Sequence, residues 1–157
     1  MFSFKTIAFA LIAAVVGANA ESHTVNFNNK CGKGTPMLIQ GPNVLSTGKP
    51  FTSNGPLISA IAYLQTGPCL FNGEKCTLVE TTLRNPTSPG SGSSSDISLI
   101  PPHAFNVAAG FNYNNGCSGH ADCTSASCPQ AFHQPNDTQV QVPCQANNAG
   151  LTITFCG

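Results

Sequence analysis

The sequence predicts an all-β fold, an antiparallel β-sandwich or flattened barrel. Its runs of β-branched and aromatic residues are short, and clusters of Gly, Pro, Asn and Ser separate them. No stretch has the periodicity of a long amphipathic helix. With 15 Gly and 12 Pro among 157 residues, the chain is rich in turns and still long enough to bury a core. We therefore expect a single all-β domain.

Nine segments carry the strand pattern. The first and the last, 23–27 and 151–155, each end close to a cysteine, so we expect these terminal strands to lie side by side, locked by a Cys31–Cys156 bond. The remaining predicted strands are residues 37–40, 57–64, 77–84, 97–100, 105–107, 111–113 and 139–142. The Ser/Gly/Pro-rich stretch 86–95 is expected to form a loop.

The first twenty residues have the features of a secretory signal peptide. Lys5 precedes an apolar run, and Ala18-Asn19-Ala20 supplies the small residues that a signal peptidase recognises. The run of about twelve residues is shorter than the roughly 20 needed to span a bilayer. We expect a signal peptide over 1–20, a mature domain over 21–157, and a secreted protein, extracellular or in a cell wall, with no membrane partner.

Eight cysteines follow the predicted signal peptide. An even number in an exported chain predicts four disulfides, although eight cysteines allow 105 pairings. Zinc is the alternative for the dense segment 117–133, which holds Cys117, His120, Cys123, Cys128 and His133. The spacing matches no standard zinc finger, and an oxidising compartment consumes thiols, so we expect no metal site.

The charge pattern excludes several classes of partner. Six basic and six acidic residues give a net charge of zero, which provides no basic surface for nucleic acid. No phosphate-binding loop, nucleophile elbow or zinc-peptidase helix is present, and no cofactor is expected. Asn136-Asp137-Thr138 predicts glycosylation of Asn136 in a surface loop. We expect the four histidines to lie on turns without a functional role; they are His23, His103, His120 and His133.

Six segments in order along nearly the whole mature chain resemble the thaumatin-like family. They are TVNFNNKC at 24–31, TLVE at 77–80, DISLI at 96–100, AFNV at 104–107, CPQAF at 128–132 and ITFC at 153–156. The resemblance implies a sandwich of the thaumatin type with the pairs Cys31–Cys156, Cys69–Cys76, Cys117–Cys144 and Cys123–Cys128. Long members carry a second, disulfide-rich domain between the positions of Cys123 and Cys128. Only residues 124–127 remain here, so the chain resembles the short members of fungi and cereals.

The resemblance also implies a site. Thaumatin-like proteins bind β-1,3-glucan, and some hydrolyse it, in an acidic cleft of one Arg, one Glu and three Asp. Glu80 and Asp96 occupy two of these positions. Pro101 replaces a second Asp and Gly73 replaces the Arg, for which Lys75 is a candidate substitute. The last Asp belongs to the missing domain.

Strand register decides what the two carboxylates can do. We expect both side chains to point outward from their strands. If the strands pair as a hairpin centred on Ser88, Glu80 lies opposite Asp96 with about 5 Å between Cβ atoms, and repulsion raises one pKa. If Arg84 lies opposite Asp96 instead, the pair is a surface salt bridge worth about 0–1 kcal/mol. A solvated Glu80 and a turn-capping Asp96 are the structural alternatives, and the sequence leaves the register open.

Three functions stay open at this point. The first is a monomeric protein that binds cell-wall β-1,3-glucan, in wall remodelling or antifungal defence, through Glu80, Asp96, Lys75 and Tyr113. Tyr113 is chosen because the chain has no Trp to stack on a sugar; Tyr63 and Phe111 are the other candidates. The second is an endo-β-1,3-glucanase with Glu80 as acid and Asp96 as base or nucleophile. The third is a non-catalytic structural or host-directed secreted protein.

Overall fold

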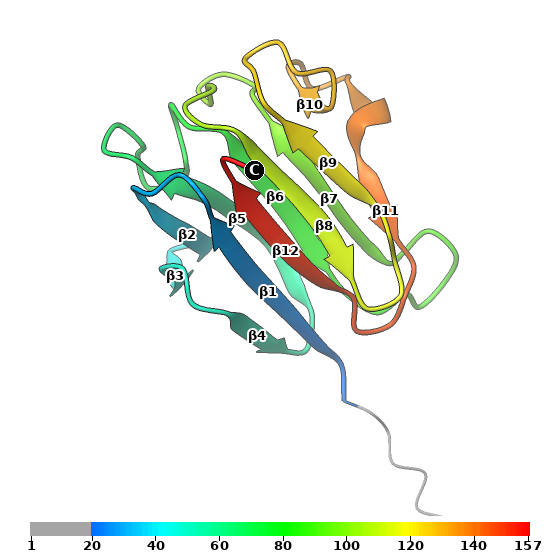
Figure 1. Cartoon of the computed structure of the whole chain (residues 1–157). Helices are drawn as coiled ribbons and strands as arrows, with labels where there is room; N and C mark the ends of the chain where they lie inside the picture. Colours follow the sequence, from blue (N-terminus) through cyan, green and yellow to red (C-terminus); the bar gives the residue numbers. More distant parts are fainter. Residues whose placement is uncertain (1–19) are drawn as a thin grey trace, which may run out of the picture.

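Two β-sheets packed face to face form the protein in a computed structural model that describes residues 20–157 (Figure 1). The signal peptide predicted over 1–20 lies, apart from Ala20, outside the described residues. The strands are β1 (Ser22–Asn29), β2 (Thr35–Gln40), β3 (Asn43–Ser46), β4 (Phe51–Asn54), β5 (Leu57–Gln65), β6 (Leu78–Leu83), β7 (Ser93–Ser98), β8 (Ala109–Asn114), β9 (His120–Cys123), β10 (Ala131–Phe132), β11 (Val142–Cys144) and β12 (Gly150–Phe155). A short 3₁₀ helix, η1 (Thr138–Val140), precedes β11.

The two sheets are mixed rather than purely antiparallel. The five-stranded sheet has the order β4-β1-β12-β8-β9, and the seven-stranded sheet has the order β10-β7-β6-β5-β2-β3, with β11 also paired to β7. The terminal strands β1 and β12 are neighbours as predicted, but they run parallel, with Val25 opposite Leu151. Strands β10 and β7 are also parallel. The antiparallel prediction is wrong at these two pairs because each joins strands separated by a long connection, which permits a crossover.

The core lies between the sheets and follows the alternation of each strand. Val25, Phe111 and Ile153 of the five-stranded sheet are fully buried, and so are Val79 and Ile97 of the seven-stranded sheet. Burying one such side chain stabilises the fold by about 1.5–3 kcal/mol. A smaller apolar cluster lies on the outer face of the seven-stranded sheet; it consists of Ile39, Tyr63, Leu78, Cys69 and Cys76.

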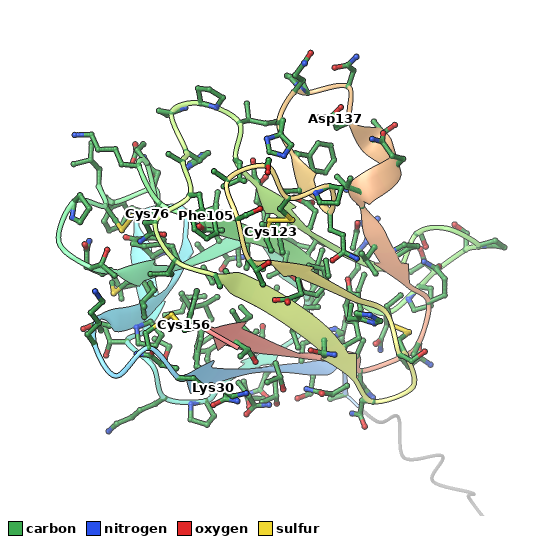
Figure 2. The ribbon with its side chains drawn as sticks, turned by 45° about the horizontal axis from the view of Figure 1, so that its top comes forward. Lys30, Cys76, Phe105, Cys123, Asp137 and Cys156 are labelled. Carbon is green, nitrogen blue, oxygen red and sulfur yellow. A yellow bond between two sulfur atoms is a disulfide. The ribbon has the colours of Figure 1, made fainter. Side chains whose placement is uncertain are left out.

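All four disulfides implied by the resemblance are present (Figure 2). Cys31–Cys156 joins the ends of β1 and β12 across 125 residues, with a Cα–Cα distance of 5.1 Å. The other pairs are Cys69–Cys76, Cys117–Cys144 and Cys123–Cys128. Because residues 20–157 contain no free cysteine, these sulfurs hold disulfides and offer no thiolate to zinc.

Several local predictions are wrong, each for a tertiary reason. Residues 105–107 form no strand, since the Asn106 side chain accepts from Thr77 N at 2.9 Å and donates to Leu64 O at 3.2 Å, which fixes this segment as a loop. Residues 139–142 form most of η1 and only the first residue of β11. His23 and His120 lie in β1 and β9, not on turns, and His23 is fully buried because it is on the same face of β1 as Val25.

Candidate functional site

Strands β6 and β7 bring the two predicted carboxylates together. They pair antiparallel with Glu80 directly opposite Asp96, so the first of the two registers is the one that the chain adopts. The alternative with Arg84 opposite Asp96 is wrong, because Thr82 already faces Ser94. Residues directly opposite each other in such a ladder have Cβ atoms about 4.5–5.5 Å apart. The pair therefore sits within reach of a single ligand.

Both carboxylates lie on the outer face of the seven-stranded sheet. Their strand neighbours Val79 and Ile97 are buried in the core, and alternation turns Glu80 and Asp96 the other way. Along the same row, Ile61 of β5 lies opposite Glu80. An apolar strip therefore borders the carboxylate pair on one side.

A polar hollow of about 210 Å³ contains the pair, and we call it the acidic hollow. Its polar lining consists of Ser59, Glu80, Thr81, Thr82, Ser94, Asp96 and Gln141. A bulge in β5 shapes its rim, where Ser59 has φ 51° and donates its backbone N–H to Thr82 Oγ1 at 3.0 Å. The volume is below the about 300–1,000 Å³ of enclosed ligand pockets. The hollow is therefore too small to enclose a drug-sized ligand.

Asp96 points outward as predicted, but it is buried and lies within β7 rather than at a strand start, so its turn-capping alternative is wrong. It is only 7% exposed, since β10 and β11 pair along the far edge of β7 and the returning chain brings Gln141 into the same hollow. Burial raises the pKa of Asp96 to about 7, and the neighbouring charge of Glu80 adds to the shift. Near neutral pH this carboxyl is therefore poised between its two protonation states.

Two buried polar atoms in the acidic hollow have no hydrogen-bond partner. They are Asp96 Oδ1 and Ser94 Oγ, and within residues 20–157 no other buried side-chain nitrogen or oxygen is unpaired. Buried polar groups are nearly always hydrogen-bonded in folded proteins, because an unpaired one costs about 1–3 kcal/mol. Both atoms belong to residues that line the acidic hollow, so the unpaired buried polar groups of residues 20–157 gather at this one site.

The basic partner expected from the resemblance is absent from the acidic hollow. Lys75 is exposed in the loop between β5 and β6, and it is not among the residues that line the hollow. Gly73 has φ +78°, and a Cβ at this position would come within 2.5 Å of Leu78 Cδ1. The position that carries Arg in long members therefore has no room for a side chain here.

Tyr113 does not serve as a sugar platform, and its prediction as a binding residue is wrong. It is 5% exposed in the core, where its hydroxyl donates to Val142 O at 3.1 Å and lies 2.9 Å from Ser95 Oγ. Burial raises the pKa of Tyr113 to about 12. Tyr63 and Phe111 are buried as well. The exposed aromatic on the outer side of the seven-stranded sheet is Phe71, whose backbone oxygen accepts from the Tyr63 hydroxyl at 3.1 Å.

The predicted glycosylation sequon lies on the surface. Asn136 is exposed in the turn before η1. Next to it, Asp137 accepts backbone N–H groups from His133 at 3.0 Å and Gln134 at 2.9 Å, and these bonds hold the pKa of Asp137 below its usual value. Figure 2 shows Asp137 in the loop at the top of the molecule. Attachment of a glycan to Asn136 stays a prediction.

The comparison with known proteins is consistent with this fold. No family model matches the chain. It is 31% identical to thaumatin-like pathogenesis-related protein 4 of Avena sativa over 176 aligned positions, which cover 99% of both chains. The chain belongs to the thaumatin-like family. Thaumatin-like pathogenesis-related protein 3 of the same plant is 30% identical over 93% of this chain and 94% of its own length.

This thaumatin-like protein retains part of the acidic residue set that the resemblance implies. Of the five cleft residues that the resemblance implies, Glu80 and Asp96 are present and adjacent. Pro101 follows β7 in an exposed turn and supplies no carboxylate. A helix long and apolar enough to cross a membrane is not found within residues 20–157.

Proposed function

We propose that this protein is a secreted, defence-related thaumatin-like protein that binds β-1,3-glucan across its acidic hollow. The observation that carries the proposal is the pairing of Glu80 with the buried, incompletely hydrogen-bonded Asp96 in one hollow. Carboxyl and hydroxyl groups are the natural partners of sugar hydroxyls. The oat relatives are named pathogenesis-related, which supports a role in defence. Four disulfides support an oxidising, extracellular location.

Binding without turnover is the primary proposal because the site is shallow and lacks a basic residue. A neutral glucan needs no counter-charge, so the two carboxyl groups and the Thr82 hydroxyl are the groups that would bind its hydroxyls. Ile61 supplies an apolar surface next to the two carboxyl groups, and the C–H faces of a sugar ring can pack against such a surface. The glucan would lie along the row from β5 to β7.

Hydrolysis is the second candidate, and the raised pKa of Asp96 favours it. A glycosidase needs one protonated carboxyl and one carboxylate, about 5–5.5 Å apart in retaining enzymes. Residues that face each other in an antiparallel pair have Cβ atoms about 4.5–5.5 Å apart, so the two carboxyl groups can approach to the retaining distance. Because the pKa of Asp96 is about 7, Asp96 would hold the proton and act as the acid, with Glu80 as nucleophile. These roles are the reverse of those predicted from the sequence.

One experiment tests both candidates. The mature protein is incubated with insoluble β-1,3-glucan at pH 5.5, and both its depletion from solution and the release of reducing sugar are measured. Glu80→Gln and Asp96→Asn should each weaken binding at least tenfold. Asp122→Asn makes the same carboxyl-to-amide change at an exposed site in β9 and should bind like the wild type.

The outcomes separate the functions. Depletion without sugar release supports binding alone, whereas sugar release that is lost in Glu80→Gln makes the protein a glucanase. If wild-type protein is not depleted, glucan is not its ligand and a protein partner becomes the next hypothesis. If Glu80→Gln and Asp96→Asn bind as tightly as Asp122→Asn, the assignment of the site to the acidic hollow is wrong.

A further inference from the structure

The outer face of the five-stranded sheet has a different chemistry from that of the acidic hollow. On its three central strands, the outward positions carry only amides, hydroxyls and glycines. They are Ser22, Thr24, Asn26 and Asn28 of β1, Gly150, Thr152 and Thr154 of β12, and Gly110, Asn112 and Asn114 of β8. One row across the sheet runs Asn26, Thr152, Asn112. This face therefore presents many neutral hydrogen-bonding groups and no large apolar side chain on these strands.

A hollow of about 350 Å³ lies at one end of this face, and we call it the neutral hollow. It sits where β1 and β12 begin and β8 ends, three strand ends that lie together in the lower part of Figure 1. Four asparagines, one serine, one threonine and Gly150 line it, without a charged or aliphatic side chain. Its volume falls within the about 300–1,000 Å³ of small-molecule sites.

The absence of a side chain at Gly150 keeps the neutral hollow open. A Cβ at this position would approach Thr24 O to 2.9 Å, so the backbones of β1 and β12 come close and form the floor. Around this floor, the Asn114 amide donates to Thr152 Oγ1 at 3.0 Å, and Asn148 Oδ1 accepts from Ser22 N at 3.0 Å. These bonds hold the walls in place before any ligand arrives.

Of the four asparagines in the wall, Asn26 is the one whose side chain takes no part in the hydrogen bonds found within residues 20–157. Asn26 lines the neutral hollow from the middle of β1, and it is only partly buried. Its amide therefore offers one carbonyl acceptor and two N–H donors to a ligand. This combination of donors and acceptors matches a vicinal pair of sugar hydroxyls, each of which donates and accepts.

We propose that the neutral hollow is a second saccharide site, specific for an uncharged sugar. The amide and hydroxyl groups of its walls can pair with sugar hydroxyls. Because the site has no cationic side chain, it does not favour anionic sugars, and because it has no aliphatic side chain, it does not favour lipids. The site goes beyond the proposed function because it lies on the opposite outer face of the sandwich. With both hollows occupied, one molecule would bridge two polysaccharide chains.

The test follows backbone amide chemical shifts while a neutral β-1,3-glucan hexasaccharide is added to the mature protein. Saturable shifts are expected at Ser22, Asn114 and Gly150. Asn26→Leu should weaken this binding at least tenfold. The matched control is Asn28→Leu, which makes the same change two residues along β1, on the same face and outside the neutral hollow; it should stay within twofold of the wild type.

The outcomes for the two hollows are independent. Shifts around Glu80 and Asp96 report the proposed function, and their loss in Glu80→Gln leaves the neutral hollow unaffected. The second site is refuted if the residues of the neutral hollow do not shift, or if Asn26→Leu and Asn28→Leu bind equally. Tighter binding of an anionic galacturonate hexasaccharide at this hollow would refute its specificity for neutral sugars.

Discussion

The two outer faces of the sandwich are built by the same strand alternation but differ in chemistry. Asp96 on β7 and Asp122 on β9 both point away from the core, but Asp96 is 7% exposed and Asp122 is exposed. The difference comes from the neighbours: β10 and β11 both flank β7, whereas β9 is the edge of its sheet. Alternation therefore decides the face of a residue, and the segments packed around it decide its chemistry.

The largest difference between the two sheets is expected in the stability that each loses when one of its disulfides is removed. Cys31–Cys156 locks β1 to β12 in the five-stranded sheet across 125 residues, and Cys69–Cys76 closes a loop of 7 residues over the seven-stranded sheet. In the chain-entropy model these bonds stabilise the fold by about 5 and about 2 kcal/mol. Replacing the first pair with serines should lower the melting temperature at least twice as far as replacing the second. Equal losses in calorimetry would contradict this difference.

The next largest effect is the dependence of stability on pH. The pKa of Asp96 is about 7 in the folded state, above its ordinary value of 3.8, so between these values the folded protein holds a proton that the unfolded chain releases. Its contribution to stability is therefore present at pH 4 and is lost as the pH rises to 7, by roughly 4 kcal/mol in total. Urea unfolding from pH 4 to pH 8 should show that Asp96→Asn removes this decline.

Asp122→Asn is the matched control for the pH experiment, because it alters the exposed Asp of the other face. It should keep the wild-type decline. Superimposable stability curves for the wild type and Asp96→Asn would mean that Asp96 titrates as an ordinary surface carboxyl.

A substitution of intermediate effect tests whether lack of space explains why position 73 carries no basic residue. Gly73→Ala places a Cβ 2.5 Å from Leu78 Cδ1 at φ +78°, so we expect a loss of about 3 kcal/mol from clash and backbone strain. Gly41→Ala shares the positive φ but meets nothing within 4 Å, and should cost about 1 kcal/mol. Unfolding by urea measures both. Equal losses would show that space does not restrict position 73.

The strands and disulfides could be predicted from the sequence better than the residues of the acidic hollow and their burial. Alternating residues identified β1, β5 and β12, and the family motifs predicted every disulfide, because both are local patterns. The same alternation places Tyr113 on the core face beside Phe111, so its burial was predictable from the period of β8. The burial of Asp96 could not be predicted in this way, because it depends on Gln141, which lies 45 residues further along the chain.

The smallest expected effect is that of removing the hydroxyl of Tyr113, which the sequence wrongly predicted to bind sugar. Tyr113→Phe removes a hydroxyl that contacts Ser95 Oγ and Val142 O inside the core. It should lower the free energy of unfolding by about 1 kcal/mol and leave glucan binding unchanged. A binding assay with insoluble β-1,3-glucan checks this. Weaker binding with unchanged stability would show that Tyr113 takes part in ligand binding after all.

The role of the acidic hollow is tested most directly by a carbon-13 NMR titration of the side-chain carboxyls of Glu80 and Asp96, with and without the β-1,3-glucan hexasaccharide. We predict that Asp96 titrates with a midpoint near 7 in the free protein. Both carboxyl signals should then move saturably with the β-1,3-linked sugar and stay in place with an α-1,4-linked hexasaccharide. A midpoint near 3.8 together with signals that glucan does not move would contradict both the electrostatics and the function assigned to the acidic hollow.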